Sequence, residues 1–260
     1  MYNYCFDIET GPLGSDVLEL IMPPFDEADV KLGNVKDPVK IAEKIEKART
    51  DHVTRFMRNA ALSPLTGEVL AIGVRGPIIS NEIKTHIIVD VNERTLIGAF
   101  FDYFASSFDR DQPHWIGFNI ANFDVPFIVR RAWHHAIAVP EQLLSRRFLN
   151  TCFTDIYLHW QLTHYPPEYL SLNSLAQFFG LPAKEGNGAQ FAELFRYDRK
   201  AAIEYLTNDV AITWEIAKRL GLFRRDQPRM ETRSAPISSP TISAPTIPEP
   251  ERPEPDIRFY

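Results

Sequence analysis

The first predicted strand limits what this chain can fold into, because it is apolar yet carries two carboxylates. Residues 2–8, YNYCFDI, are rich in aromatic and β-branched side chains, and Gly11-Pro12 closes the segment. Side chains alternate along a strand, so Asp7 and Glu9 share one face. Two like charges on a half-buried face repel, and desolvation adds to the cost unless a cation compensates. This face is therefore either solvated or a cation site.

Alternating strands and helices are expected up to about residue 225. Apolar positions at helical spacing follow Asp37-Pro38, an N-cap and first-turn proline, and predict a helix of about 22 residues. The first strand and the next two along the chain are predicted to form a meander. The later units mix helix and strand, which indicates one α/β domain with a mixed sheet. The further expected strands are 67–76, 84–91 and 114–119, and the further helices are 93–104, 123–138, 171–179, 188–195 and 198–220.

Composition excludes several classes of protein. No run approaches the roughly 18 uninterrupted apolar residues of a membrane span, and the N-terminus shows no cleavable leader, so we expect a soluble, cytoplasmic protein without membrane contact. The two cysteines, Cys5 and Cys152, have no pairing pattern and are expected to be reduced core residues. The net charge of -6 disfavours a nucleic-acid partner at first sight, but four carboxylates around two divalent cations would bring the folded part near neutrality.

The last 35 residues, 226–260, differ from the rest. They hold eight of the 20 prolines, no glycine, and six acids against four arginines. Proline at this density removes hydrogen-bond donors and fixes φ, so we predict an extended, disordered tail. The tip Asp256–Tyr260 (DIRFY) regains apolar character and resembles the tips of bacterial single-stranded-DNA-binding proteins, so it is either a protein-docking peptide or inert.

Two further acids stand where a plain core would not have them. Asp124 follows a predicted strand, and Asp124-Val125-Pro126 also has the form of a helix start with aspartate as the N-cap. Both interpretations stay open at this point. Tyr205 and Asp209 are four residues apart on a strong helix, hence on one side of an otherwise apolar stripe, where an acid needs a partner.

These segments resemble known motifs. FDIET, GFNIANFDVPFI and YLTNDVAIT are similar to the three ordered motifs of the DEDD exonucleases, in the tyrosine form called DEDDy because Tyr205 stands four before Asp209. The second motif and SLNSLAQFFGLPAKEG are most similar to the proofreading exonuclease domain of family B DNA polymerases. The acids are separated by 115 residues (124 minus 9) and 85 residues (209 minus 124).

The resemblance covers about residues 2–222 and implies a fold. That fold is ribonuclease H-like, with the first strand central in a five-stranded mixed sheet flanked by helices. The segment of about 11–65 departs from the compact pattern as a helical insertion after the first strand. We therefore expect a stand-alone exonuclease domain over 1–225 and the proline-rich tail over 226–260.

The resemblance also implies a site and a reaction. Asp7, Glu9, Asp124 and Asp209 would hold two divalent cations, Mg²⁺ or Mn²⁺, and Tyr205, protonated at neutral pH, would orient the attacking water. The enzyme would release nucleoside 5′-monophosphates from the 3′ ends of single-stranded DNA. Thr10, Asn119 and Phe123 would contact the terminal nucleotide, although Phe123 is equally consistent with a core position.

Two alternatives remain from the sequence. An RNA-trimming 3′–5′ exoribonuclease would share the DEDDy residues, and a non-catalytic nucleic-acid-binding module would share the fold. Such a module usually lacks an acid, whereas this chain has all four and the tyrosine. Proofreading, DNA repair and scavenging are all compatible with the motifs.

Overall fold

The centre of the fold is a five-stranded mixed sheet in the order β3-β2-β1-β4-β5. The computed structural model describes residues 2–77, 82–109, 112–144, 152–162, 168–182 and 191–224. β2 pairs antiparallel with β1 and β3, whereas β4 pairs parallel with β1 and β5. The expected mixed sheet with the first strand at its centre is confirmed. The strands are β1 (Asn3–Pro12), β2 (Gly67–Pro77), β3 (Ile83–Ile88), β4 (His114–Gly117) and β5 (Phe153–Asp155).

β1 is longer than its sequence suggested. Gly11-Pro12 lies inside the strand rather than beyond it, because Gly11 and Pro12 still pair with the first two residues of β2. The register shifts between Glu9 and Thr10, which marks an irregularity next to the acidic face. β4 pairs only with Asn3–Cys5 of β1. The second half of β1 therefore extends past the carboxyl end of its parallel neighbour.

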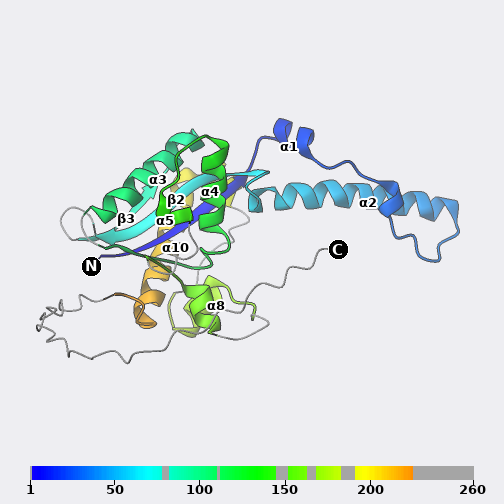
Figure 1. Ribbon diagram of the computed structural model, residues 1–260. Helices are drawn as coiled ribbons and strands as arrows, with labels where there is room; N and C mark the ends of the chain where they lie inside the picture. The colour runs from blue at the N-terminus through cyan, green and yellow to red at the C-terminus, as the bar shows by residue number, and fades with distance from the viewer. Residues whose placement is uncertain are drawn as a thin grey trace, which may run out of the picture. The chain divides into compact units, whose positions relative to one another are not determined.

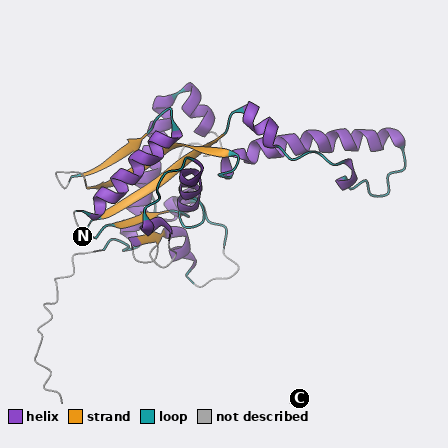
Figure 2. Cartoon of the chain, turned by 45° about the horizontal axis from the view of Figure 1, so that its top comes forward, coloured by secondary structure: helices purple, strands orange, loops and turns teal. Residues whose placement is uncertain are grey.

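Helices cover both faces of the sheet (Figures 1 and 2). Tyr4, Phe6 and Ile8 of β1 contribute to one core together with α3 (Glu93–Phe108) and α4 (Asp124–His134). Cys5 contributes to the other core, together with α8 (Leu172–Phe178), α9 (Phe191–Tyr197) and α10 (Arg199–Arg219). Alternation along β1 thus sends even-numbered side chains toward α3 and α4, and odd-numbered ones toward α10.

The insertion between β1 and β2 is helical, as expected. It contains α1 (Ser15–Ile21), the 3₁₀ turn η1 (Glu27–Asp29), α2 (Pro38–Asn59) and the 3₁₀ turn η2 (Ala60–Leu62). The predicted start of α2 is confirmed, because the Asp37 side chain accepts from the Val39 N–H and Pro38 occupies the first turn. No residue of α2 is buried, so this helix lies outside both cores.

Several short elements have no counterpart among the sequence predictions. β5, α1, α5 (Glu141–Leu144) and α7 (Ile156–Gln161) each span seven residues or fewer, too short for a clear period. Both cysteines are buried and reduced, as expected. The predictions for the tail and its tip, Asp256–Tyr260, lie outside the described residues. Among the described helices, none has the length and apolar character needed to cross a membrane.

Candidate active site

Three of the predicted acids meet on the face of β1 that is covered by α10. Asp7, Glu9 and Asp209 each offer a carboxylate oxygen within 4.8 Å of the others. Asp209 is 1% exposed and Glu9 8%, whereas Asp7 is half-buried. Asp7 and Glu9 point toward α10 because they share the odd-numbered face of β1 with Cys5, which packs in the same core. The structure therefore brings together residues 200 positions apart (209 minus 9).

A glycine in β2 allows α10 to lie this close to the sheet. Gly73 pairs with Asp7 across the β1–β2 ladder. A Cβ atom at Gly73 would lie 2.7 Å from Cγ2 of Val210 and 3.0 Å from Cγ of Leu206, closer than side chains normally approach. Val210 and Leu206 belong to α10 and are fully buried. Because Gly73 has no side chain, α10 packs close to the sheet, and this brings Asp209 near the acids of β1.

Asp124 reaches the same strand from the other side of the sheet. Its Oδ1 atom accepts a hydrogen bond from the backbone N–H of Ile8, at 3.0 Å, between Asp7 and Glu9. β4 does not extend this far along β1, which explains why Asp124 can reach the Ile8 N–H. The alternative interpretation of Asp124 as an N-cap is wrong: α4 begins at Asp124, its N-cap is Phe123, and no side-chain cap is formed.

The surroundings of Asp124 disfavour its ionised form. Burial raises the pKa of the Asp124 carboxyl well above its ordinary value, and the nearby negative charge of Asp7 adds to this increase. The hydrogen bond from Ile8 opposes the shift but does not cancel it. A cation close to Asp7 and Asp124 would favour the ionised form and relieve the repulsion.

Tyr205 lies one helical turn before Asp209 on α10. Its ring is half-buried and sits 5.9 Å from the ring of Phe191 in α9, centroid to centroid. The Tyr205 hydroxyl oxygen and Asp209 Oδ1 are both shielded from solvent. The structure thus places the tyrosine on the helix face that carries the acid, as the four-residue spacing predicts.

Two of the three expected substrate-binding residues, Thr10 and Phe123, line a cleft beside Glu9, and the third, Asn119, lies in the turn before α4. Thr10 follows Glu9 on β1, and its hydroxyl donates a hydrogen bond to the Ala61 carbonyl at 2.7 Å. Phe123 is half-buried, with its ring 5.5 Å from that of Phe127, and together with Thr10 it lines a cleft beside Glu9. Phe123 thus combines a core contact with a cleft position. Asn119 has a left-handed backbone, φ 61°, in the turn between β4 and α4.

Asp155 supports this turn and was missed by the sequence reasoning. Its two carboxylate oxygens accept from the backbone N–H groups of Asn119 and Ala121, both at 2.9 Å, and Oδ1 also accepts from the N–H of Tyr157. Burial raises the pKa of Asp155, although these hydrogen bonds oppose the rise. The only sequence feature that could have indicated this role is the aspartate itself, which stands at the N-cap position of the short helix α7.

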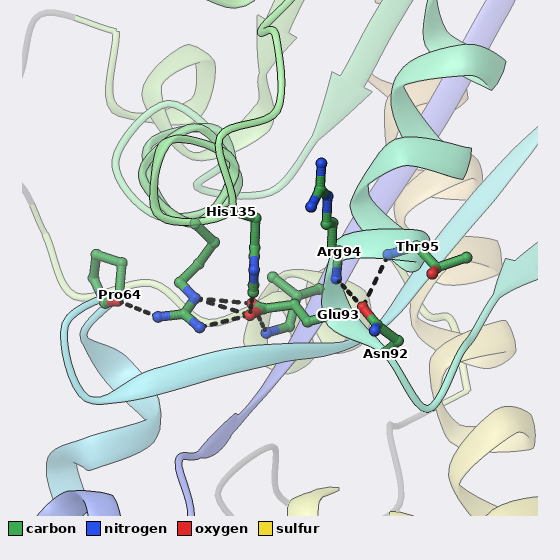
Figure 3. Close-up of polar contacts among 8 residues, drawn as sticks. Pro64, Asn92, Glu93, Arg94, Thr95 and His135 are labelled. Atoms are coloured by element: carbon green, nitrogen blue, oxygen red, sulfur yellow. Dashed lines mark hydrogen bonds and ion pairs between the residues drawn. The ribbon is translucent and has the colours of Figure 1, made fainter.

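The far end of α4 is fixed by a buried charged network (Figure 3). The Glu93 carboxylate accepts from Nε and Nη2 of Arg131, at 2.9 and 2.6 Å, and Nε2 of His135 lies 2.6 Å from it. It also accepts the Val69 N–H, and Arg131 donates to the Pro64 carbonyl. Burial favours the neutral acid, but these hydrogen bonds outweigh it and lower the pKa of Glu93. The network ties α4 to α3, β2 and the segment after η2.

The chemistry of the four acids suits a hard divalent cation. Mg²⁺ and Mn²⁺ bind carboxylate oxygens in preference to nitrogen or sulfur ligands. Asp7, Glu9 and Asp209 offer three oxygens close enough to share one ion, and Asp124 is adjacent to Asp7. Repulsion among the ionised carboxylates destabilises the site without a cation, and a bound cation would remove this destabilisation. The arrangement can therefore hold divalent metal beside an open cleft.

A family model matches residues 78–231, more than half of the 260-residue chain. The family is described as a predicted 3′–5′ exonuclease related to the exonuclease domain of PolB. The chain belongs to this family. Its membership supports a nuclease that hydrolyses nucleic acid. The matched residues include Asp124, Tyr205 and Asp209, whereas Asp7 and Glu9 lie on β1, before the match begins.

The fold is similar to that of a solved polymerase. The family B DNA polymerase from the hyperthermophilic archaeon Pyrobaculum calidifontis matches with a TM-score of 0.51 and 18% sequence identity, over 85% of this chain and 24% of that chain. The chain therefore spans about a quarter of the polymerase's length. The expected ribonuclease H-like fold is confirmed by this match together with the family. No curated protein matches the sequence.

Proposed function

We propose that this member of the exonuclease family is a metal-dependent enzyme that removes nucleotides from the 3′ end of single-stranded DNA. The observation that carries the proposal is the meeting of Asp7, Glu9 and Asp209 within 4.8 Å, with Asp124 bonded to the intervening Ile8. The products are nucleoside 5′-monophosphates. Family membership alone would not specify which residues act, because the match leaves out β1.

Each residue has a distinct role in the proposed reaction. Asp7, Glu9 and Asp209 would hold one divalent cation, and Asp7 and Asp124 would hold a second. Bound divalent cations would make water nucleophilic at neutral pH and neutralise charge on the leaving 3′-oxygen. Tyr205 keeps its proton and orients the attacking water by a hydrogen bond. Thr10, Asn119 and Phe123 position the terminal nucleotide.

The preference for DNA over RNA rests on the likeness to a family B DNA polymerase, since no described residue is assigned to sensing a 2′-hydroxyl. An RNA-trimming enzyme is the second candidate, because the same acids serve either sugar. Protein docking through Asp256–Tyr260 and a cytoplasmic location remain predictions from the sequence.

A time course on matched oligonucleotides tests the proposal. Single-stranded DNA and RNA of one sequence, labelled at the 5′ or the 3′ end, are incubated with Mg²⁺, Mn²⁺ or a chelator. We expect the 5′-labelled DNA to shorten stepwise and the 3′-labelled DNA to release labelled mononucleotide at once, only with metal. Release of mononucleotide first from the 5′ end, or equal rates in chelator, would contradict it. Faster cleavage of RNA would favour the second candidate.

A further inference from the structure

A cleft of about 800 Å³ opens beside the acidic cluster. Ile8, Glu9 and Thr10 of β1 form one wall, continuous with the cluster, and Phe123 closes the end next to α4. Residues of the last turn of α2, of the turn η2 and of α9 also line the cleft. The insertion therefore borders the candidate active site instead of only extending the sheet.

The returning end of the insertion is firmly attached to the catalytic strand. The Thr10 hydroxyl donates to the Ala61 carbonyl, and the Leu13 N–H donates to the Thr66 carbonyl at 3.0 Å. Arg131, itself held by Glu93, donates to the Pro64 carbonyl at 3.1 Å. These bonds fix η2 and, with it, the preceding residues of α2. Arg58 is consequently held at the rim of the cleft, although α2 buries none of its own residues.

The rim of the cleft presents two guanidinium groups. Arg58 of α2 and Arg196 of α9 are exposed, and neither forms a salt bridge with another residue in the described ranges. By contrast, Arg49 and Arg131 are paired with glutamates. α2, which carries Arg58, holds six basic against three acidic side chains in a chain of net charge -6. Glu193 of α9 also lines the cleft.

An aromatic side chain completes the cleft surface. Tyr197 follows Arg196, lines the same cleft and is 76% exposed. An exposed ring beside cationic side chains is the arrangement that binds single strands, because every base can stack on it and phosphates pair with the guanidinium groups. A negatively charged, unstacked polymer matches this surface better than a neutral ligand does.

We propose that this cleft binds the single-stranded 3′ segment of the DNA substrate, with Arg58 and Arg196 on its phosphates and Tyr197 under a base. The inserted helix thereby contributes a substrate-binding residue to the exonuclease. This inference rests on the proposed function for the direction of the strand. The terminal phosphodiester reaches Glu9 and the adjacent acids, and the preceding nucleotides lie between α2 and α9.

Binding without turnover tests the cleft separately from catalysis. Fluorescence anisotropy with a labelled oligothymidine in chelator is compared among wild type, Arg58→Gln, Arg196→Gln and Arg55→Gln. Arg55 lies on α2 one turn before Arg58, lines a different cavity and serves as the matched control. We expect about tenfold weaker binding for either cleft variant and no change for the control. In the double variant, the slope of log affinity against log salt should fall by about 1.4, since each single-strand phosphate contact contributes about 0.7.

Steady-state kinetics give a second readout. On oligothymidine with Mg²⁺, the two cleft variants should raise KM about tenfold and change kcat less than twofold. On the p-nitrophenyl ester of thymidine 5′-monophosphate, which is too short to fill the cleft, kcat/KM should stay at the wild-type value. Tyr197→Ala should weaken oligothymidine binding at least about fivefold.

The outcomes separate the two proposals. Cleft variants that bind and cleave oligothymidine like Arg55→Gln would overturn the cleft assignment and leave the exonuclease intact. A wild-type protein that binds oligothymidine through Arg58 and Arg196 but never cleaves it would support the cleft and contradict the proposed function. A wild-type protein that does not bind single strands at all would overturn both.

Discussion

Replacing Asp209 with asparagine should make the metal-free protein more stable. Asp209 has an oxygen within 4.8 Å of one from Asp7 and one from Glu9. Two unit charges at that separation repel by about 3.5 kcal/mol at an effective dielectric constant of about 20. Asp209→Asn removes two such repulsions, but solvent around the half-buried Asp7 reduces the gain. We expect the free energy of unfolding in chelator to rise by about 1–3 kcal/mol.

With divalent cations, wild type should become more stable than Asp209→Asn. A cation that binds the folded wild type at 100 times its Kd adds about 2.7 kcal/mol, which corresponds to a rise of roughly 5–11 °C in Tm for a domain of this size. The asparagine variant should lose most of this rise, because a carboxylate ligand is gone. Urea unfolding in chelator and thermal melts with and without Mn²⁺ measure the two effects.

A control on the same helix isolates the cluster. Glu204→Gln removes an exposed acid of α10 that contacts only Lys200 weakly, at 3.9 Å, among the described residues. It should behave like wild type in both conditions. The reasoning fails if Asp209→Asn is less stable than wild type in chelator, or if Mn²⁺ raises the Tm of wild type and Asp209→Asn equally.

Three further predictions concern the support of the site and the chemistry. Gly73→Ala should cost about 1–3 kcal/mol in urea unfolding, because its Cβ overlaps side chains of α10, and should lower kcat as Asp209 is displaced; unchanged values would contradict the role of close packing. Glu93→Gln should cost about 3–5 kcal/mol at pH 7 by leaving Arg131 buried without its partner. The pKa of Glu93 is lowered in the folded state, so its contribution to the free energy of unfolding is complete above the ordinary glutamate pKa of about 4.3. This contribution is lost as the pH falls through the lower folded value. The free energies of unfolding of wild type and Glu93→Gln should therefore become equal in strong acid. Tyr205→Phe should reduce kcat about 10²-fold without changing metal-dependent Tm; a change within twofold would remove Tyr205 from the mechanism.

Local patterns explain which parts of the fold the sequence could predict. β1 and α2 have strong local signals, an aromatic run in one and the Asp37-Pro38 start in the other. Asp7, Glu9 and Asp209 each interrupt an apolar pattern, which left a solvated face open, and they were recognisable as one site only from the order of the three motifs that resemble those of the DEDDy exonucleases. Local signals failed where tertiary contacts decide. Asp124 has the form of an N-cap, but its carboxylate binds the Ile8 N–H, because β4 ends before reaching that part of β1.

The remaining features depend on contacts between distant segments. β5 has three residues, so no period can reveal it. Asp155 accepts hydrogen bonds both from the turn between β4 and α4 and from the first turn of α7, and these segments are far apart in the sequence. Gly73 is an ordinary strand glycine until α10 packs on it. The return of the insertion to the site follows from bonds such as that between Thr10 and Ala61, 51 positions apart. Spacing along the chain carries none of this information.

The central claim is that carboxylates from β1, α4 and α10 act together on the phosphodiester at a 3′ end. The most direct measurement is the rate of mononucleotide release from 5′-labelled single-stranded DNA in Mg²⁺ by wild type, Asp7→Ala and Asp124→Ala. We predict that each variant remains folded and loses at least about 10³-fold in kcat. Near wild-type release by either folded variant would contradict the claim.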